Sequence, residues 1–144
     1  MSITRPATRT HPTGDQPKRF VFVLLNNFTL LCFSAAVESL RIANRMAGKE
    51  LYAWRIIGEG GDAAYCSAGT GFKLDGDLDD VGRDDVIMIC GGIDVQAATT
   101  KRLLGWLRRE ARKGPVVAGL CTACLLYTSP SPRDQRGSRM PSSA

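Results

Sequence analysis

Apolar residues follow one another without alternation in three short stretches of the sequence, at residues 20–25, 86–90 and 116–118. Uninterrupted apolar runs of this length are typical of parallel β-strands that are covered on both faces. Residues 52–57 predict a further strand, and residues 63–68 a short one. Two longer segments, residues 33–46 and 100–113, repeat apolar positions at helical spacing and therefore predict amphipathic helices.

Each predicted helix has an apolar face and a stop signal. The first ends at Gly48, and the second is capped by Thr99 or Thr100 and ends at Gly114. The residues expected to face inward are Ala36, Val37, Leu40, Ala43 and Met46 or Ala47 in the first helix, and Leu103, Leu104, Leu107 and Ala111 in the second. The basic residues of the second helix are expected to form a solvated surface.

The alternation of strands and helices predicts an α/β fold, with a mostly parallel sheet sandwiched by helices. In such sheets, ligands bind at the carboxyl ends of the strands. Asn26 and Asn27 follow the first strand, Gly91 and Gly92 follow the strand at residues 86–90, and Cys121 follows the last strand. These residues are therefore candidates for ligand binding.

Cys121 lies where the last strand turns sharply into the start of a predicted helix, after the small residues Ala118 and Gly119. Unpaired backbone N–H groups and the helix dipole at such a position favour the thiolate over the thiol. Cys121 is the candidate reactive residue, and Thr122 beside it is a candidate ligand contact. The alternative is that Cys121 is a small buried apolar residue in a strand-to-helix turn.

The composition fits one globular domain, because the chain has 144 residues and is 44% hydrophobic. The net charge of +5 arises mostly at the ends: residues 1–18 and 127–144 each carry three basic residues and one acidic residue, against thirteen and twelve in between. The nearly neutral middle carries no compositional sign of a nucleic-acid surface. No apolar run reaches the roughly 20 residues of a membrane span, and five scattered cysteines suit reduced thiols, so we expect a cytoplasmic protein without membrane contact.

Motifs for a cofactor or a metal ion are not found. The glycines at residues 58–61 lack the order of a phosphate-binding loop. The acidic stretch at residues 75–85 lacks the glycine and terminal glutamate of a calcium loop, so it is expected to be a solvated surface. The single histidine, His11, is too near the N-terminus to be expected as a catalytic partner of Cys121. We therefore expect no cofactor and no metal.

The character of the sequence changes at both ends. Residues 1–18 are polar and predict a flexible leader, whereas residues 19–126 carry the folded domain. From residue 127 the periodicity stops and prolines accumulate, which predicts a disordered tail. This tail resembles translated sequencing-adapter read-through, so we expect residues 127–144 to be non-native and the domain to be incomplete at its C-terminus.

Three motifs taken together resemble one family: the helix segment AVESLRIAN at residues 36–44, the strand end Cys90-Gly91-Gly92, and the elbow GLCT at residues 119–122. They resemble the DJ-1/PfpI domain, which is flavodoxin-like and similar to class I glutamine amidotransferases. More narrowly, residues 19–126 resemble the N-terminal sensing domain of AraC-type transcriptional regulators of the GlxA group. The resemblance implies a non-catalytic domain that senses a small amine or quaternary-ammonium metabolite, derived for example from choline or carnitine.

The same resemblance implies two partners besides the effector. DNA would be bound only by a C-terminal helix-turn-helix region, which residues 127–144 do not provide, so the chain is expected to be a fragment. A homodimer is also compatible with the resemblance. Glu38 is either ion-paired with Arg41 or Arg45 on the helix surface or part of the ligand site, and it stays among the candidates.

Two departures from the family pattern bear on catalysis. DJ-1-like hydrolases and deglycases place an acid in the loop after the first strand, where residues 28–32 have none, and PfpI-like peptidases place a histidine where this chain has Thr122. A nucleophile without an activating partner is a poor catalyst, which favours the regulator. Two alternatives remain: a cysteine-dependent hydrolase or deglycase with Cys121 as nucleophile, and a redox dithiol formed by Cys121 and Cys124.

Overall fold

The computed structural model describes residues 16–126, which form an α/β sandwich around a four-stranded sheet. The sheet contains β1 (Lys18–Leu24), β2 (Tyr52–Ile57), β5 (Val86–Cys90) and β6 (Val116–Leu120), in the order β2-β1-β5-β6. All neighbouring strands are parallel, which confirms the predicted sheet. The predicted leader, apart from its last three residues, and the predicted tail at 127–144 lie outside the described residues.

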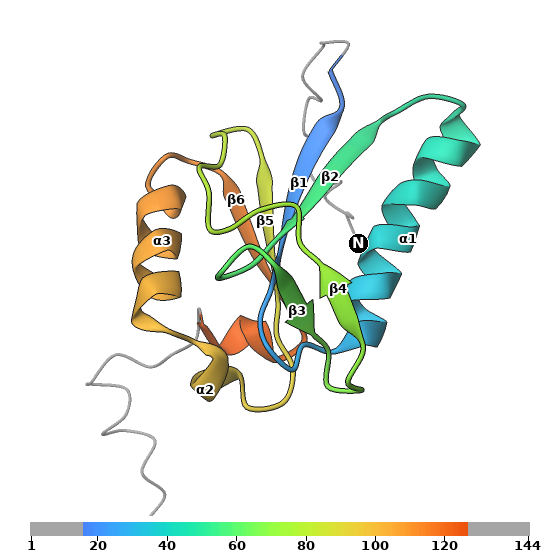
Figure 1. Cartoon of the computed structure of the whole chain (residues 1–144). Coiled ribbons are helices and arrows are strands. Elements are labelled where there is room, and N and C mark those ends of the chain that lie inside the picture. Colours follow the sequence, from blue (N-terminus) through green and yellow to red (C-terminus); the bar gives the residue numbers. More distant parts are fainter. Residues whose placement is uncertain (1–15, 127–144) are drawn as a thin grey trace, which may run out of the picture.

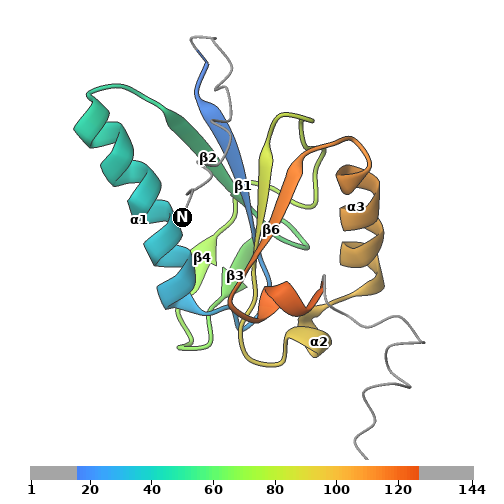
Figure 2. The same cartoon turned by 180° about the vertical axis from the view of Figure 1, so that it is seen from behind.

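Helices cover the two faces of the sheet (Figures 1 and 2). Helix α1 (Leu30–Ala47) packs on one face, and α2 (Val95–Ala98) and α3 (Lys101–Ala111) lie on the other side. The side chains of the strands alternate between two cores, because successive residues of a strand point to opposite faces. Val21, Val23, Ile87 and Ile89 meet α3, while Phe22 and Leu24 meet α1.

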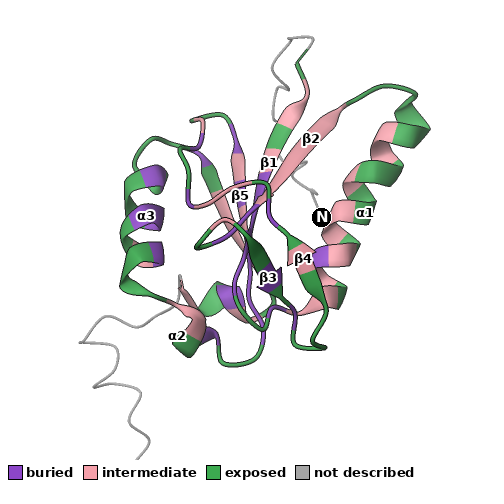
Figure 3. Ribbon diagram, in the orientation of Figure 1, coloured by how far each residue is buried: buried purple, intermediate pink, exposed green. Residues whose placement is uncertain are grey.

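The two helices bury different shares of their surface, as Figure 3 shows. In α1 only Phe33 is fully buried, where its ring meets Phe22 edge-on with centroids 5.6 Å apart. Ala36, Val37 and Leu40 pack against the sheet as predicted, but Met46 is 84% exposed. Ala47 is exposed as well, so the prediction that Met46 or Ala47 faces inward is wrong.

The inward face of α3 also differs in part from the prediction. Leu103 and Leu107 are buried as expected, but the other buried positions are Trp106 and Glu110 rather than Leu104 and Ala111. Polar residues can occupy this face because a neighbouring loop pairs with them. The indole Nε1–H of Trp106 donates to the backbone oxygen of Asp79 at 2.8 Å, and the Glu110 carboxylate accepts from the backbone N–H of Val81 at 2.9 Å.

The acidic stretch at residues 75–85 is a structural loop and not only the solvated surface that we predicted. Leu78 and Val81 are buried in the core under α3, and the Asp85 side chain is only 7% exposed. Asp85 accepts a hydrogen bond from Arg19 Nε at 2.9 Å and another from the backbone N–H of Gly82. A buried carboxylate must be paired to be tolerated, and this loop supplies the partners.

Four elements were not predicted as they occur. The strand expected at residues 63–68 is shorter, β3 (Ala63–Tyr65), and it pairs antiparallel with β4 (Gly71–Lys73) to form a hairpin. Helix α2 was missed because four residues are too few for a periodic signal. The helix expected after the elbow is a short 3₁₀ helix, η1 (Cys121–Leu126).

Candidate functional site

The sheet has its switch point between β1 and β5. The chain moves from β1 to β2 on one side, and the later strands β5 and β6 add on the other side. In open parallel sheets, ligands bind in the crevice outside the carboxyl ends of the strands at this point. Here the loop after β1, the loop after β5 and the start of η1 meet at that edge, at the bottom of the molecule in Figure 1.

The three segments are held together through their backbones. The N–H of Thr29 donates to the oxygen of Gly91 at 3.0 Å, and the N–H of Gly91 donates to the oxygen of Leu120 at 3.3 Å. A Cβ atom on Gly92 would lie 2.1 Å from the backbone oxygen of Asn27, and one on Gly91 would lie 2.7 Å from the N of Ala123. Both glycines therefore serve the close approach of other chain segments.

Cys121 occupies a strained elbow. Its φ angle is +56°, in the left-handed region that residues with a side chain seldom adopt. The turn back is so tight that a Cβ atom on Gly119 would lie 2.7 Å from the N of Cys124. The Cys121 side chain is nevertheless exposed, so the sharp turn presents the thiol at the surface of the edge, and the alternative of a buried structural cysteine is wrong.

The surroundings of the Cys121 thiol favour its ionised form. Its Sγ atom lies 3.3 Å from the hydroxyl oxygen of Thr29. The hydrogen bond with Thr29 and a hydrogen bond from the Thr122 backbone N–H lower the pKa of Cys121 from its ordinary value against the effect of burial, and Cys32 and the Thr122 side chain make smaller contributions in the same direction. Thr29 is the N-cap residue of α1 but makes no side-chain capping bond, so its hydroxyl remains available to the thiol.

Cys32 is the second thiol of this site, and the sequence analysis missed it as a functional residue. It lies in the first turn of α1, three residues after Thr29, and is half-buried. Burial, followed by the charge of Cys121 and the hydrogen bond to Cys121, raises the pKa of Cys32. Because the predicted helix began only at residue 33, Thr29 and Cys32 were not recognised as neighbours on one helix face.

The predicted polar residues at this edge differ in their exposure and in their contacts. Asn26 and Asn27 are exposed in the loop after β1, and Asn27 has a φ angle of +59°. Thr122 donates its hydroxyl hydrogen to the backbone oxygen of Gly92 at 2.7 Å, so this side chain ties η1 to the loop after β5. The structure thus brings Asn26, Asn27, Gly91, Gly92, Cys121 and Thr122 to one edge of the sheet.

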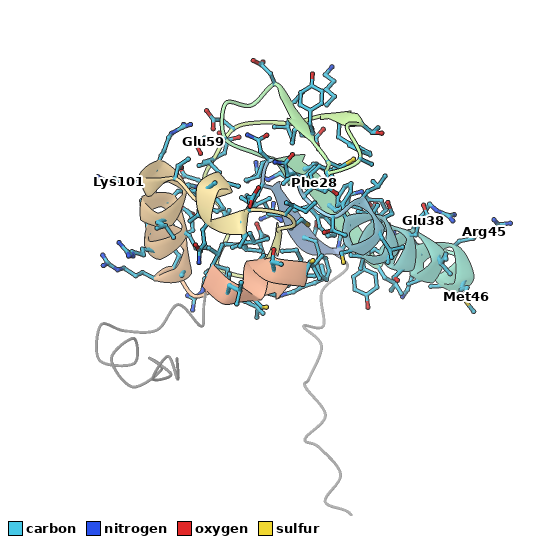
Figure 4. All side chains as sticks on the ribbon, turned by 90° about the horizontal axis from the view of Figure 1, so that it is seen from below. Phe28, Glu38, Arg45, Met46, Glu59 and Lys101 are labelled. Atoms are coloured by element: carbon cyan, nitrogen blue, oxygen red, sulfur yellow. The ribbon has the colours of Figure 1, made fainter. Side chains whose placement is uncertain are left out.

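Glu38 does not reach this edge. The Nε–H of Arg41 donates a bifurcated hydrogen bond to the two carboxylate oxygens of Glu38, at 2.9 and 3.0 Å, and Nη2 of Arg41 donates a further one. The hydrogen bond with Arg41 lowers the pKa of Glu38. Figure 4 shows Glu38 on the outer part of α1, in the direction of Arg45 and Met46. In this position the residue forms the surface ion pair that was one of its two interpretations.

A small cavity of about 90 Å³ opens on the α3 side of the same edge. Asn26, Glu59 and Thr100 supply its polar lining, and the Thr100 hydroxyl donates to the Glu59 carboxylate at 2.7 Å. Glu59 was not a predicted site residue, because it lies in a glycine-rich loop without a motif. A larger open hollow of about 340 Å³ lies at the amino ends of β1 and β2, where Arg19 and Asp85 line it.

Residues 16–126 contain no cluster of three histidine, cysteine or acidic side chains that could hold a metal ion. In the same range, no helix has the length and apolar character needed to cross a bilayer.

Curated proteins and solved structures both match the chain, whereas no family model does. The HTH-type transcriptional regulator GbdR of Pseudomonas aeruginosa is 33% identical over 120 residues, covering 83% of this chain and 33% of the relative. CdhR of the same species is 32% identical over 117 residues, and GlxA of Rhizobium meliloti is 30% identical over 121. The chain therefore spans about a third of the length of the curated relatives it matches.

Solved structures match the fold. An AraC family transcriptional regulator from Pseudomonas putida superposes with a TM-score of 0.61 at 21% identity, covering 72% of this chain and 55% of that one. A ThiJ/PfpI family protein from Pseudomonas syringae gives a TM-score of 0.60 at 16% identity, covering 88% of this chain and 50% of that one. The sandwich is therefore a DJ-1/PfpI-type fold, as the sequence motifs indicated.

Proposed function

Because the chain belongs to the AraC-type transcriptional regulators that include GbdR, CdhR and GlxA, we propose that it forms the effector-sensing domain of such a regulator. The effector is a small amine or quaternary-ammonium metabolite. DNA is bound by a separate helix-turn-helix region outside residues 16–126, and the protein acts in the cytoplasm. The domain itself occupies residues 19–126.

The observation that carries the proposal is the convergence of three loops at the switch point of the sheet. Asn26 and Asn27 are exposed there, and their neighbouring backbone is fixed by the close contacts of Gly91 and Gly92. A preformed edge with a few free polar groups suits a small ligand better than a macromolecule. Binding at this edge can reach the elbow, because Thr122 and Gly91 connect η1 to the same loops.

The charge of the edge supports a cationic effector. Glu59 lines the cavity beside Asn26 and accepts a hydrogen bond from the neutral hydroxyl of Thr100. The nearest guanidinium, that of Arg102, is hydrogen-bonded to Asp77 in the neighbouring loop at 2.9 Å and interacts with Glu59 only through its charge. A carboxylate at a cavity mouth that is not hydrogen-bonded to a cationic side chain attracts a positive ligand.

The surroundings of Cys121 favour sensing over covalent catalysis. Within residues 16–126, the side chains that interact with its thiol are those of Thr29, Cys32 and Thr122. None of these groups is a base that takes up a proton near neutral pH, which a hydrolase or deglycase would need beside its nucleophile. Cys121 is therefore reactive towards electrophiles without supporting turnover.

Calorimetric titration with choline, glycine betaine and carnitine tests the effector class. At least one of the three is expected to bind the wild-type chain. Glu59→Gln is expected to weaken that binding by about tenfold, the loss of one charge interaction. Glu50→Gln is the matched control, because Glu50 is exposed and lies outside the cavity lining.

The sequence-derived candidate Glu38 supplies a second comparison. Glu38→Gln is expected to leave the affinity unchanged, because its carboxylate is engaged by Arg41 on the outer part of α1. If none of choline, glycine betaine and carnitine gives a heat of binding in the titration, the proposed effector class is rejected. Steady turnover of a glyoxal or amide substrate by the same preparation, abolished in Cys121→Ser, would instead support the enzyme.

A further inference from the structure

Three segments of the chain are joined around the start of α3, beside the cavity that Glu59 and Thr100 line. The Thr100 hydroxyl donates to Glu59 at 2.7 Å, and the backbone N–H of Gly60, the next residue of that loop, donates to the Asp77 carboxylate at 3.1 Å. Arg102, in the first turn of α3, donates to the same carboxylate at 2.9 Å. Asp77 therefore binds a guanidinium close to the carboxylate that we propose to attract the effector.

The two carboxylate oxygens of Asp77 have separate partners. Oδ1 accepts from the backbone N–H groups of Gly60 and Leu78, at 3.1 and 2.7 Å, and so fastens the loop after β2 to the loop that carries Asp77. Oδ2 accepts from Nη2 of Arg102. The hydrogen bond from Arg102, followed by that from the Leu78 N–H, lowers the pKa of Asp77 to about 2. One oxygen thus joins two loops, and the other binds an arginine.

Glu59 lies within reach of the Arg102 side chain. The Glu59 carboxylate accepts from Thr100, two residues before Arg102 in the same helix start, and Figure 4 shows Glu59 near that end of α3. The Arg102 side chain is 55% exposed, so packing does not hold it in place, and its ion pair with Asp77 orients it. The charge of Glu59 already acts on Arg102, although more weakly than the bond to Asp77.

Arg102 carries the positive charge that would compete with a cationic effector. We propose that Asp77 is a positioning residue for the effector site, because it keeps the Arg102 guanidinium off the Glu59 carboxylate and leaves that carboxylate to the effector. The proposal rests on the proposed function. It gives Asp77 and Arg102 a role in effector affinity, although neither is among the residues that line the cavity.

Asp77→Asn is the informative substitution. The amide oxygen can keep the backbone bonds that Oδ1 accepts, whereas the amide nitrogen replaces the oxygen that binds Arg102 and is itself a donor. Arg102 is then expected to turn to Glu59. The affinity for choline, measured by calorimetry, is expected to fall about two- to fivefold, the effect of one exposed ion pair. Choline is the first probe because it has no carboxylate to bind Arg102, and glycine betaine and carnitine are titrated alongside it.

Asp80→Asn is the matched control. Asp80 belongs to the same loop and also pairs with a basic residue of α3, but its partner Lys113 follows the opposite end of the helix, at 3.3 Å. This substitution is expected to leave the affinity unchanged. A loss equal to that in Asp77→Asn would overturn the proposal, because the loss would then reflect the acidity of the loop as a whole.

A second substitution separates the possible roles of Asp77. Arg102→Gln alone leaves the loop contacts of Asp77 intact and is expected to raise the affinity about twofold, since a nearby positive charge is removed. In this background, Asp77→Asn is expected to have no further effect on binding. If Asp77 acted only through the loop or through its own charge, the loss would persist without Arg102, and the proposal would be wrong.

Unfolding in urea tests the arginine without an effector. In the Asp77→Asn background, Glu59→Gln and Arg102→Gln are expected to be coupled, changing the unfolding equilibrium constant about two- to fivefold beyond the product of their separate effects. With Asp77 present the coupling should be smaller, since Arg102 is bound to Asp77. No coupling in the Asp77→Asn background would overturn the proposal. If no amine binds the wild type, the proposed function fails, whereas this coupling still decides whether Asp77 restrains Arg102.

Discussion

The two ends of the sheet are built from different interactions. At the carboxyl end, backbone segments touch directly, with Gly91, Gly92 and Gly119 at the points where a side chain would collide. At the amino end, charged side chains join the loop at residues 75–85 to α3 and β1, through Glu110 and Asp85. Polar side chains at the carboxyl end are thereby left available for chemistry, whereas those at the amino end are used for structure.

The difference has a physical reason. Close backbone contacts position a loop without consuming its side chains, so Asn26, Asn27 and Cys121 can stay exposed. A buried carboxylate such as Glu110 must instead satisfy its acceptors, and it does so with the Val81 N–H, Lys113 and Arg109. The larger hollow at the amino end is lined by such paired groups, which explains why we place the effector at the other end.

The largest expected effect comes from filling a glycine contact at the carboxyl end. Gly92→Ala would place a Cβ atom 2.1 Å from the Asn27 oxygen, so the loops must separate. We expect a loss of about 3 kcal/mol or more in the free energy of unfolding, measured with urea. Gly105→Ala is the control, because nothing lies within 4 Å of its Cβ position in α3. That substitution should stabilise by about 0.5 to 1 kcal/mol.

A smaller effect is expected from the amino end. Glu110→Gln leaves Lys113 and Arg109 without their carboxylate and weakens the bond to the buried Val81 N–H. The cost is about 1 to 3 kcal/mol in the free energy of unfolding near neutral pH. The exposed Glu50→Gln serves as control. Equal stability of the two variants would mean that the Glu110 network contributes nothing to holding the loop.

The same variant tests a pH dependence. Burial alone would raise the pKa of Glu110, but hydrogen bonds from Lys113, the Val81 N–H and Arg109 outweigh it and lower that pKa. A carboxyl group with a depressed pKa contributes stability above its unfolded pKa of about 4.3, and the contribution is lost as the pH falls through the folded value. The wild type should therefore lose its advantage over Glu110→Gln as the pH falls below about 4.

The smallest effect concerns one thiol and leaves the fold intact. In a Cys124→Ser background, the alkylation rate of Cys121 is expected to rise with a midpoint below the free-thiol pKa of about 8.5. Thr29→Val removes the hydroxyl 3.3 Å from the sulfur and should move the midpoint upward. Thr70→Val, at an exposed position in the β3–β4 turn, should not. A midpoint at or above the free-thiol value in the parent would contradict the activated state of Cys121.

The sheet was predictable from the sequence because short, uninterrupted apolar runs are typical of buried parallel strands. The strands at residues 52–57 and 86–90 were predicted with their observed bounds, and β6 only two residues too short. The elbow was predictable for a related reason, since a β-branched strand that ends in Gly119 and a cysteine allows little but a sharp turn. The rule that ligands bind at the carboxyl ends of parallel strands then predicted the edge at which we propose that the effector binds.

The tertiary structure decided which polar groups are paired and which thiols meet. Glu110 was not singled out in the sequence, because the N–H that makes its burial tolerable comes from a loop about thirty positions earlier. Likewise, nothing near Cys32 indicates a partner, because Cys121 reaches it only when β1, β5 and β6 lie side by side. Hydrophobic periodicity is a property of neighbouring residues and can be interpreted from the sequence. Contacts between distant polar side chains, by contrast, exist only once the chain has folded.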